Sequence, residues 1–236
     1  MQSILAYIDE RTRTYECLPL YVFLADDRVA PEERLAFAPA IAHFVMSFSD
    51  LYAFALREEP ARDRFQEIVN AHTYEDGGHW KWFLADLDQL GSNPTLRLSD
   101  ALRFVWDGST MHQRLLSCHM FRLSLGASSI QRLILVHCIE ATGRVALQAA
   151  AKAGDALAQR TGRKLVYLGH HHVDTESQHT LEDDNVRRSL ERDVLDNATR
   201  EALRKVVDQC FDAFTTFSEE LLAWTRARNA RSDGKI

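Results

Sequence analysis

His172, Glu176 and His179 have the spacing most specific for metal chemistry in this chain. An α-helix turns by about 100° per residue, so the three side chains fall within an arc of about 60° on one helical face. Imidazole and carboxylate groups are suitable ligands for iron, manganese or zinc. The spacing therefore predicts a metal-binding face on the helix that carries these residues.

A second set of candidate ligands lies in residues 70–80, where one helical face presents His72, Glu75, Asp76 and His79. If His72 is placed at zero, the other three side chains lie at about −60°, +40° and −20° around the helix. All four side chains are therefore candidate metal ligands on one face of the helix.

Glu140 is the third candidate, because it is a carboxylate on a mostly apolar helical face. Leu133 and Val136 lie seven and four residues before it, and Leu147 lies seven after it. A buried carboxylate must be ion-paired, protonated or bound to a metal. A salt bridge to Arg144 is the main alternative to a metal bond for Glu140.

Each motif has an ordinary explanation when taken alone, such as a surface histidine or a solvated helix start. Six of the ten histidines, however, lie in the two short windows that also hold carboxylates. Together the three segments supply up to four histidines and four carboxylates, which favours convergence on one interior metal site. The remaining histidines are expected to be core or surface residues, and His137 is the best of them to support a ligand, one turn before Glu140.

The hydrophobic periodicity places these ligands on helices. Apolar residues recur every three or four positions along most of the chain, which is the helical period, and only 10 Gly and 5 Pro interrupt it. The adjacent Gly77 and Gly78 each cost roughly 1 kcal/mol in a helix relative to Ala, so they predict a deformed turn such as a π-bulge. We expect an all-α single domain over residues 1–236, with helices near residues 2–14, 31–57, 60–90, 98–106, 111–125, 128–153, 166–182, 184–193 and 196–228.

The composition bears on nucleic-acid binding, on cellular location and on membrane insertion. A net charge of −6, with Lys and Arg scattered singly, gives no basic surface, so nucleic-acid binding is not expected. The four cysteines show no close pairing, and the first residues lack the pattern of a signal peptide, which predicts a cytoplasmic protein. Residues 35–56 are the most apolar stretch, but Pro39, His43 and Asp50 within it favour a buried helix over a membrane span.

The three motifs together resemble the ligand pattern of the haem-oxygenase-like di-iron oxidase and oxygenase superfamily, which includes proteins similar to pyrroloquinoline-quinone synthase and thiaminase II. The family places a carboxylate and a His on one core helix, a Glu on a second, and His-x-x-x-(Asp/Glu)-x-x-His on a third. His172, Glu176 and His179 match the third helix in full. Glu140 matches the second, within the sequence Ile-Glu-Ala-Thr-Gly.

The first helix departs from the family pattern. Members with a seven-residue separation would have a Glu where this chain has His72, whereas members with a closer pair would use Glu75 or Asp76 with His79. The metal ligands that the resemblance implies are therefore Glu75, His79, Glu140, His172, Glu176 and His179, with His72 as a further candidate.

The resemblance implies a haem-oxygenase-like bundle of about seven core helices that holds two Fe(II) ions and uses O2 as co-substrate. The expected activity is oxidation of a small organic substrate, such as an amino acid, an amine or a fatty acid. The expected partners are this substrate, an electron donor for the irons and, in a homodimer, a second copy of the chain.

Two other functions are compatible with the same fold. A metal-free hydrolase similar to thiaminase II would need a cysteine nucleophile beside an acid, but Cys138 lies about 200° from Glu140 around a helix, so the two do not face each other. A non-catalytic binding or regulatory protein would retain the bundle without its chemistry. The metal content of the purified protein separates the iron enzyme from both alternatives.

Residues 35–56 are also candidates for the substrate pocket, because they combine an apolar character with the aromatic side chains of Phe44, Phe48, Tyr52 and Phe54. In helical bundles, ligand cavities are mostly apolar with a few polar anchors. We expect this segment to line a pocket for a substrate with an apolar part, anchored at the iron by an amine or a carboxylate. Plain core packing is the alternative.

Overall fold

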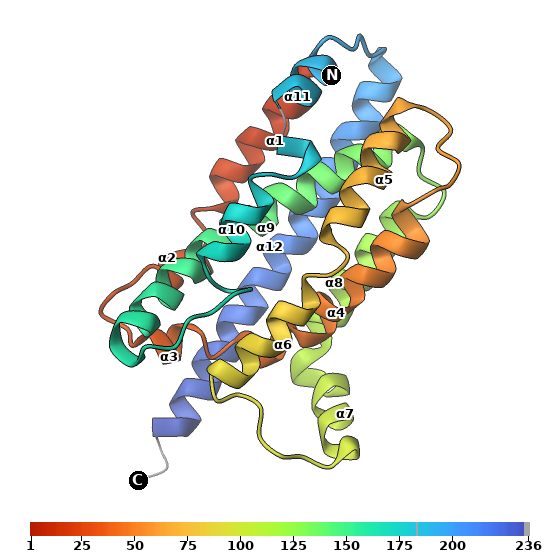
Figure 1. Cartoon of the computed structure of the whole chain (residues 1–236). Helices are drawn as coiled ribbons and strands as arrows, with labels where there is room; N and C mark the ends of the chain where they lie inside the picture. The colour runs from red at the N-terminus through yellow and green to blue at the C-terminus, as the bar shows by residue number, and fades with distance from the viewer. Residues whose placement is uncertain (183, 234–236) are drawn as a thin grey trace.

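The computed structural model describes residues 1–182 and 184–233 (Figure 1). These residues form helices and turns without a β-strand, so the predicted all-α fold class is confirmed. In chain order the α-helices are α1 (Gln2–Tyr15), α2 (Pro19–Leu24), α3 (Pro31–Arg34), α4 (Ala42–Leu51), α5 (Arg64–Asp76), α6 (Trp80–Gln89), α7 (Leu98–Trp106), α8 (Met111–Ser124), α9 (Ser129–Thr161), α10 (His170–Glu176), α11 (Asp184–Glu191) and α12 (Asn197–Asp233). The shorter turns are the 3₁₀ turns η1 (Ala38–Ile41), η3 (Gly108–Thr110) and η4 (Thr180–Glu182), and the π-helical turn η2 (Tyr52–Leu56).

The two longest helices, α9 and α12, run side by side through the molecule (Figure 1). Residues 133–136 of α9 are all buried, as expected for a helix that other helices surround. A capping box between Ser128 and Gln131 fixes the start of α9, and Gly162 ends it with a φ of 76°, a left-handed conformation that suits glycine. The helix that carries Glu140 is therefore fixed at both ends.

The other two ligand segments are placed by packing against α9. Helices α5 and α10 both contact α9, as do α1, α2 and α8. The buried apolar side chains form one connected cluster that extends from Met1 to Leu222 in α12. Burial of each large aliphatic side chain in such a cluster contributes roughly 1.5–3 kcal/mol. This shared core fixes the distances between the helices that carry the candidate ligands.

Two of the predicted long helices are divided in the structure. Residues 31–57 form α3, η1, α4 and η2, and residues 60–90 form α5 and α6 with a turn at residues 77–79. The prediction of a deformed turn at Gly77 and Gly78 is correct, but the helix is interrupted there, because paired glycines have a high backbone entropy and no side chains to pack. The π-helical turn lies at Tyr52–Leu56 instead. Helix α10 is shorter than predicted, and α2 was not predicted.

The loop before α10 passes very close to α9, and two glycines make this approach feasible. A Cβ atom on Gly154 of α9 would lie 2.8 Å from the Leu168 carbonyl oxygen. A Cβ atom on Gly169 would collide with the Leu165 carbonyl group. Any side chain at either position would push the loop outward. The glycines thus set the position of the helix that carries His172.

Two segments are long and apolar enough to cross a membrane by length and composition, Pro31–Leu56 and Ser129–Thr161. In the bundle, 50% and 56% of their most apolar windows are buried against other parts of the chain. Core helices of helical bundles have the same length and composition, because they too are surrounded by apolar side chains.

Candidate metal centre

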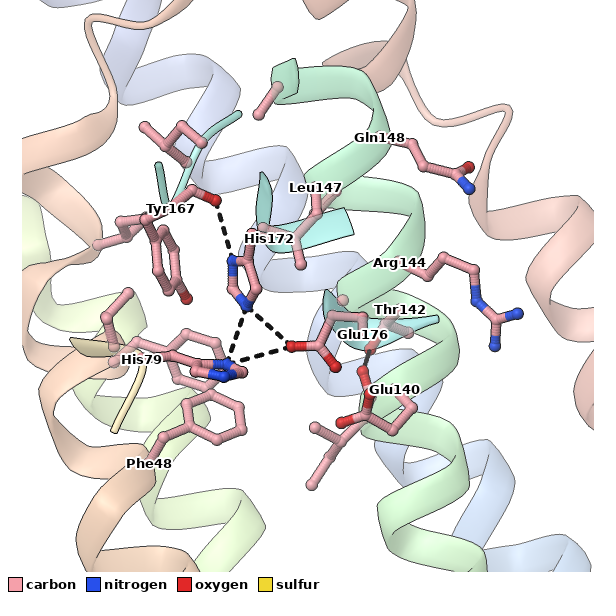
Figure 2. Close-up of a pocket in the computed structure, with 18 of the residues that line it drawn as sticks. Phe48, His79, Glu140, Thr142, Arg144, Leu147, Gln148, Tyr167, His172 and Glu176 are labelled. Carbon is pink, nitrogen blue, oxygen red and sulfur yellow. Dashed lines mark hydrogen bonds and ion pairs between the residues drawn. The ribbon is translucent and has the colours of Figure 1, made fainter. Parts of the chain in front are cut away.

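The three predicted ligand segments converge at one interior point. Figure 2 shows one or two side chains of each segment there, His79 between α5 and α6, Glu140 of α9, and His172 and Glu176 of α10. The expected convergence of the three motifs is therefore confirmed. The side chains that come together are His72 and Asp76 of α5, His79 just before α6, Glu140 of α9, His172 and Glu176 of α10, and His179 just after α10.

One group of four side chains contains Asp76, His79, His172 and Glu176, with ligand atoms that all lie within 4.8 Å of one another. His79 Nδ1 lies 2.7 Å from Asp76 Oδ1 and 3.2 Å from Glu176 Oε1. His172 Nε2 lies 2.8 Å from the same Glu176 oxygen. Two imidazoles and two carboxylates therefore point at one small volume.

The other side chains form overlapping groups of three on the far side of Glu176. One contains Glu140, Glu176 and His179, and another contains His72, Asp76 and Glu140. His72 Nε2 lies 3.1 Å from Glu140 Oε1, and His179 Nδ1 lies 2.9 Å from Glu176 Oε2. Glu176 therefore turns one oxygen toward His79 and His172 and the other toward His179.

Glu75 and Asp76 take different positions at the end of α5. Glu75 forms a group with His72 and His179, but its carboxylate also accepts hydrogen bonds from the Thr180 backbone N–H at 3.0 Å and the Thr180 hydroxyl at 2.6 Å. Asp76 takes part in both the four-residue group and a three-residue group. Asp76 is therefore better oriented than Glu75 to supply the carboxylate of the first ligand helix.

The four histidines of the cluster are buried, and the ring of His172 is oriented by a hydrogen bond on the side away from the cluster. His72, His79, His172 and His179 are between 0% and 8% exposed. His172 Nδ1 lies 2.9 Å from the Tyr167 carbonyl oxygen, to which it can only donate. The proton therefore sits on Nδ1 in the neutral ring, and the lone pair of Nε2 faces the cluster, as in metal sites where a backbone carbonyl selects the tautomer.

The cluster favours protonated histidines when only protons are present. Burial opposes the charge on His72, but the carboxylate of Glu140 outweighs it and raises the His72 pKa to about 9. Burial is likewise outweighed at His79, where Asp76 and Glu176 raise the pKa to about 9. For Glu140, burial raises the pKa to about 7 although His72 opposes the shift. The positive charge in this site is therefore carried by protons on His72 and His79, and a metal ion that binds these imidazoles would replace the protons.

Three buried polar atoms of the cluster, His72 Nδ1, Glu176 Oε2 and His179 Nδ1, make no well-aligned hydrogen bond with the described residues. The last two lie 2.9 Å apart as an ion pair, and His72 Nδ1 lies 3.8 Å from a Glu75 oxygen. Burying a polar atom without a good hydrogen bond is costly, by roughly 1–3 kcal/mol when it has no partner at all, so these atoms have the capacity to bind a further partner. A divalent cation supplies one, since neutral imidazole and carboxylate are its ligands. The donor set therefore fits iron, and it fits manganese or zinc as well.

Arg144, Cys138 and His137 do not take part in the cluster. In Figure 2 the guanidinium group of Arg144 points away from Glu140, whose carboxylate faces His72 instead. Cys138 is fully buried in the core beside Cys210, so a thiol nucleophile does not face Glu140. Burial lowers the pKa of His137 to about 4, and its Nε2 has no hydrogen-bond partner among the described residues. His137 is half-buried and belongs to none of the groups of candidate metal ligands.

Asp86 of α6 is a supporting residue that the sequence analysis missed. It is fully buried, and its two oxygens accept hydrogen bonds from Val166 N at 2.7 Å and Leu168 N at 2.8 Å. These bonds hold the loop whose Tyr167 carbonyl orients His172. The feature that singled out Glu140, a carboxylate on an apolar helical face, would also have identified Asp86.

An apolar cavity of about 350 Å³ opens from the cluster. Asp76, His79, Glu140, His172 and Glu176 line one part of it, and Figure 2 shows Phe48 and Tyr167 on its wall. The side chains from residues 35–56 that line it are Phe37, Ile41, Phe44, Val45, Phe48, Ser49 and Tyr52. The prediction that this segment lines a cavity beside the site is therefore confirmed, although Phe54 points outward and is 79% exposed.

No family model matches this chain, and no curated protein matches it. The chemistry of the centre is therefore inferred from its own geometry and from the ligand pattern in the sequence.

We expect the affinity for a divalent metal ion to rise with pH between about pH 6 and about pH 9. Below a pKa of about 9, His72 and His79 carry protons that a metal ion must displace, so each released proton weakens apparent binding by up to about tenfold per pH unit. Competition between the protein and a chelator for Zn(II), repeated across this range, measures the slope. A flat profile would show that these histidines are not ligands.

Proposed function

We propose that this chain is a non-haem di-iron oxidoreductase of the haem-oxygenase-like superfamily, which uses O2 to oxidise a small organic substrate. The observation that carries this proposal is the convergence of four histidines and three carboxylates beside an apolar cavity. The cluster contains two overlapping ligand groups that share Glu176. Two histidines with a carboxylate are the ligand set typical of non-haem Fe(II) oxygenases.

The ligand groups would suffice for two ions. Asp76, His79, His172 and Glu176 form one group that would hold an ion, and His72, Glu140 and His179 belong to overlapping groups of three that would hold another. When bound, iron supplies the electrons that activate O2 and the oxidising power for the substrate. The chain itself supplies burial that excludes bulk water, fixed ring orientations and a cavity that positions the substrate.

The test is anaerobic titration with Fe(II), followed by exposure to O2. We expect about two iron ions per chain and O2 uptake that increases when a suitable amine, amino acid or carboxylic acid is present. Reductant must be supplied, because the chain holds no electron donor of its own in the proposed reaction. Iron that does not bind, or O2 uptake equal to that of free Fe(II), would contradict the proposal.

The metal content also decides between this function and the two alternatives. A thiaminase-II-like hydrolase and a non-catalytic binding protein would both function without bound metal. The burial of Cys138 in the core, away from the cavity, speaks against the hydrolase. The burial of four histidines and three carboxylates in one cluster, several of them without a well-aligned hydrogen bond, speaks against a bundle that needs no metal, because burying such groups is unfavourable.

The cavity favours a substrate with an apolar part and one polar end near the metal ligands. A ladder of aromatic rings leads away from the cluster, with 5.4 Å between the ring centres of Tyr52 and Phe48 and 4.6 Å between those of Phe48 and Phe44. These three neighbouring rings offer apolar contact along the hydrocarbon part of a substrate. Medium-chain carboxylic acids and amines are therefore the first probes.

We expect a medium-chain acid or amine that fits the cavity to raise the melting temperature of the metal-loaded protein. At about 100 times its Kd, a ligand adds roughly 2.7 kcal/mol, which corresponds to about 5 °C or more for a chain of this size. Phe48→Trp fills the cavity and should remove the shift. Phe54→Trp, on the exposed side of the same segment, is the matched control. A shift of the same size in both variants would place the ligand elsewhere.

A further inference from the structure

Tyr52 is a buried residue of the cavity wall whose hydroxyl group the proposed function does not use. Its side chain is 1% exposed, and its hydroxyl group has no hydrogen-bond partner among the described residues. Its ring lies 5.8 Å from the His72 ring, in an edge-to-face arrangement. A buried hydroxyl group without a partner is costly, so its presence beside the candidate ligands calls for an explanation.

The backbone at Tyr52 is also unusual. Tyr52 begins the π-helical turn η2, in which the Arg57 N–H donates to the Tyr52 carbonyl oxygen five residues earlier, at 3.0 Å. Single π-helical turns within helices are rare and frequently occur at functional sites. A regular α-helix through residues 52–56 would rotate the following residues and change how this segment meets α5. The turn thus belongs to the geometry that places the Tyr52 ring beside the cluster.

Tyr52, Asp76 and Glu140 line the same cavity, where burial raises the pKa of the Tyr52 hydroxyl group and the two carboxylates raise it further. Asp76 is the carboxylate within hydrogen-bonding reach of the hydroxyl group, although the two do not form a well-aligned bond. Glu140 Oε1 already faces His72 Nε2 at 3.1 Å. Asp76 Oδ1 lies 2.7 Å from His79 Nδ1, whereas Asp76 Oδ2 has only His72 Nε2 at 3.9 Å. Asp76 Oδ2 is therefore the carboxylate oxygen with capacity to accept a further bond.

We propose that Tyr52 is a positioning residue of the metal centre, whose hydroxyl group donates a hydrogen bond to Asp76 when the centre holds metal. This inference rests on the metal-binding part of the proposed function. Asp76 is a short side chain at the C-terminal end of α5, beside two glycines, and needs a partner to stay turned inward. Outer hydrogen bonds of this kind orient metal ligands, and their loss typically weakens binding by about 10- to 100-fold.

The proposal makes opposite predictions for the metal-free and metal-bound protein, which a purely structural role does not. Tyr52→Phe removes a hydroxyl group that lacks a partner, so the melting temperature of the metal-free protein should stay the same or rise. The Kd for Co(II), measured against a chelator, should increase by about 10- to 100-fold. The visible absorption spectrum of bound Co(II) should also shift, because it reports the coordination geometry.

Tyr15→Phe is the matched control, since Tyr15 lines the same cavity but its hydroxyl group bonds to Ser218 and Tyr21. This variant should lower the melting temperature and leave the Kd for Co(II) unchanged. A wild-type Kd in Tyr52→Phe, or a joint loss of metal-free stability and Co(II) affinity, would overturn the proposal. If the wild-type protein itself bound no Co(II) or Fe(II), the proposed function would fail first, and this inference with it.

Discussion

Glu176→Ala is expected to abolish binding of the two metal ions proposed for this centre, which is the largest effect that we expect of a single substitution there. Oε1 of Glu176 lies 2.8 Å from His172 Nε2, and Oε2 lies 2.9 Å from His179 Nδ1. Removing the carboxylate leaves both ligand groups one oxygen short and increases the repulsion between two neighbouring cations. We expect the affinity for Fe(II) to fall by more than ~100-fold, because loss of a mere outer partner already costs about 10- to 100-fold.

The measurement is the iron content after anaerobic loading and removal of free metal. His179→Ala and Glu140→Ala should each lose most of the bound iron, since each removes a ligand from one side of the cluster. Asp174→Ala is the matched control for Glu176, because Asp174 is an exposed carboxylate on the same helix. Cys138→Ser should also retain iron. Wild-type iron content in Glu176→Ala or His179→Ala would place the metal elsewhere.

The local part of the site could be predicted from the sequence because helical geometry is local. Residues four and seven apart share a helical face whatever surrounds them. The spacing of His172, Glu176 and His179 was therefore sufficient to predict that these side chains lie close together. The structure refines even this motif, because α10 ends at Glu176 and His179 lies in the following turn. The all-α fold class was equally accessible, since it needs only the apolar period and few glycines and prolines.

The choice between Glu75 and Asp76 could not be predicted, because it depends on contacts between distant segments. Glu75 is held by Thr180, which is 105 residues away in the sequence. Where α5 ends also matters, since the turn after Asp76 rotates His79 out of the helical register assumed for the projection. Helical projections assume a continuous helix and fail where the helix is interrupted.

The groups that orient the ligands could not be predicted either, because they too depend on contacts between distant segments. The Tyr167 carbonyl that orients His172 belongs to a loop, and backbone carbonyls carry no sequence signature. The close approach of this loop to α9 depends on Gly154, whose role is visible only when the Leu168 carbonyl is seen against it. Tertiary contacts of this kind decide where a correctly predicted ligand points.

Asp86→Asn is expected to cause the largest loss of stability outside the cluster and to weaken metal binding with it. Burial raises the pKa of Asp86, although hydrogen bonds from the loop backbone oppose the shift. Asparagine has one acceptor oxygen and one NH2 group, so either Val166 N or Leu168 N would face a donor instead of an acceptor. An unpartnered buried N–H and a lost charge-assisted bond together cost roughly 3 kcal/mol, or about 6–12 °C in melting temperature for a chain of this size.

The effect on metal binding follows from the path that leads from Asp86 to the cluster. Asp86 holds the loop on both sides of Tyr167, the Tyr167 carbonyl accepts from His172 Nδ1, and His172 Nε2 faces the ligands. We therefore expect Asp86→Asn to weaken Co(II) binding by about tenfold, as other outer partners of metal-bound histidines do. Asp88→Asn is the matched control, because Asp88 is exposed on the same helix and its side chain accepts a hydrogen bond from the nearby Asn93. A lowered melting temperature with unchanged Co(II) affinity in Asp86→Asn would show that the loop stabilises the fold without orienting His172.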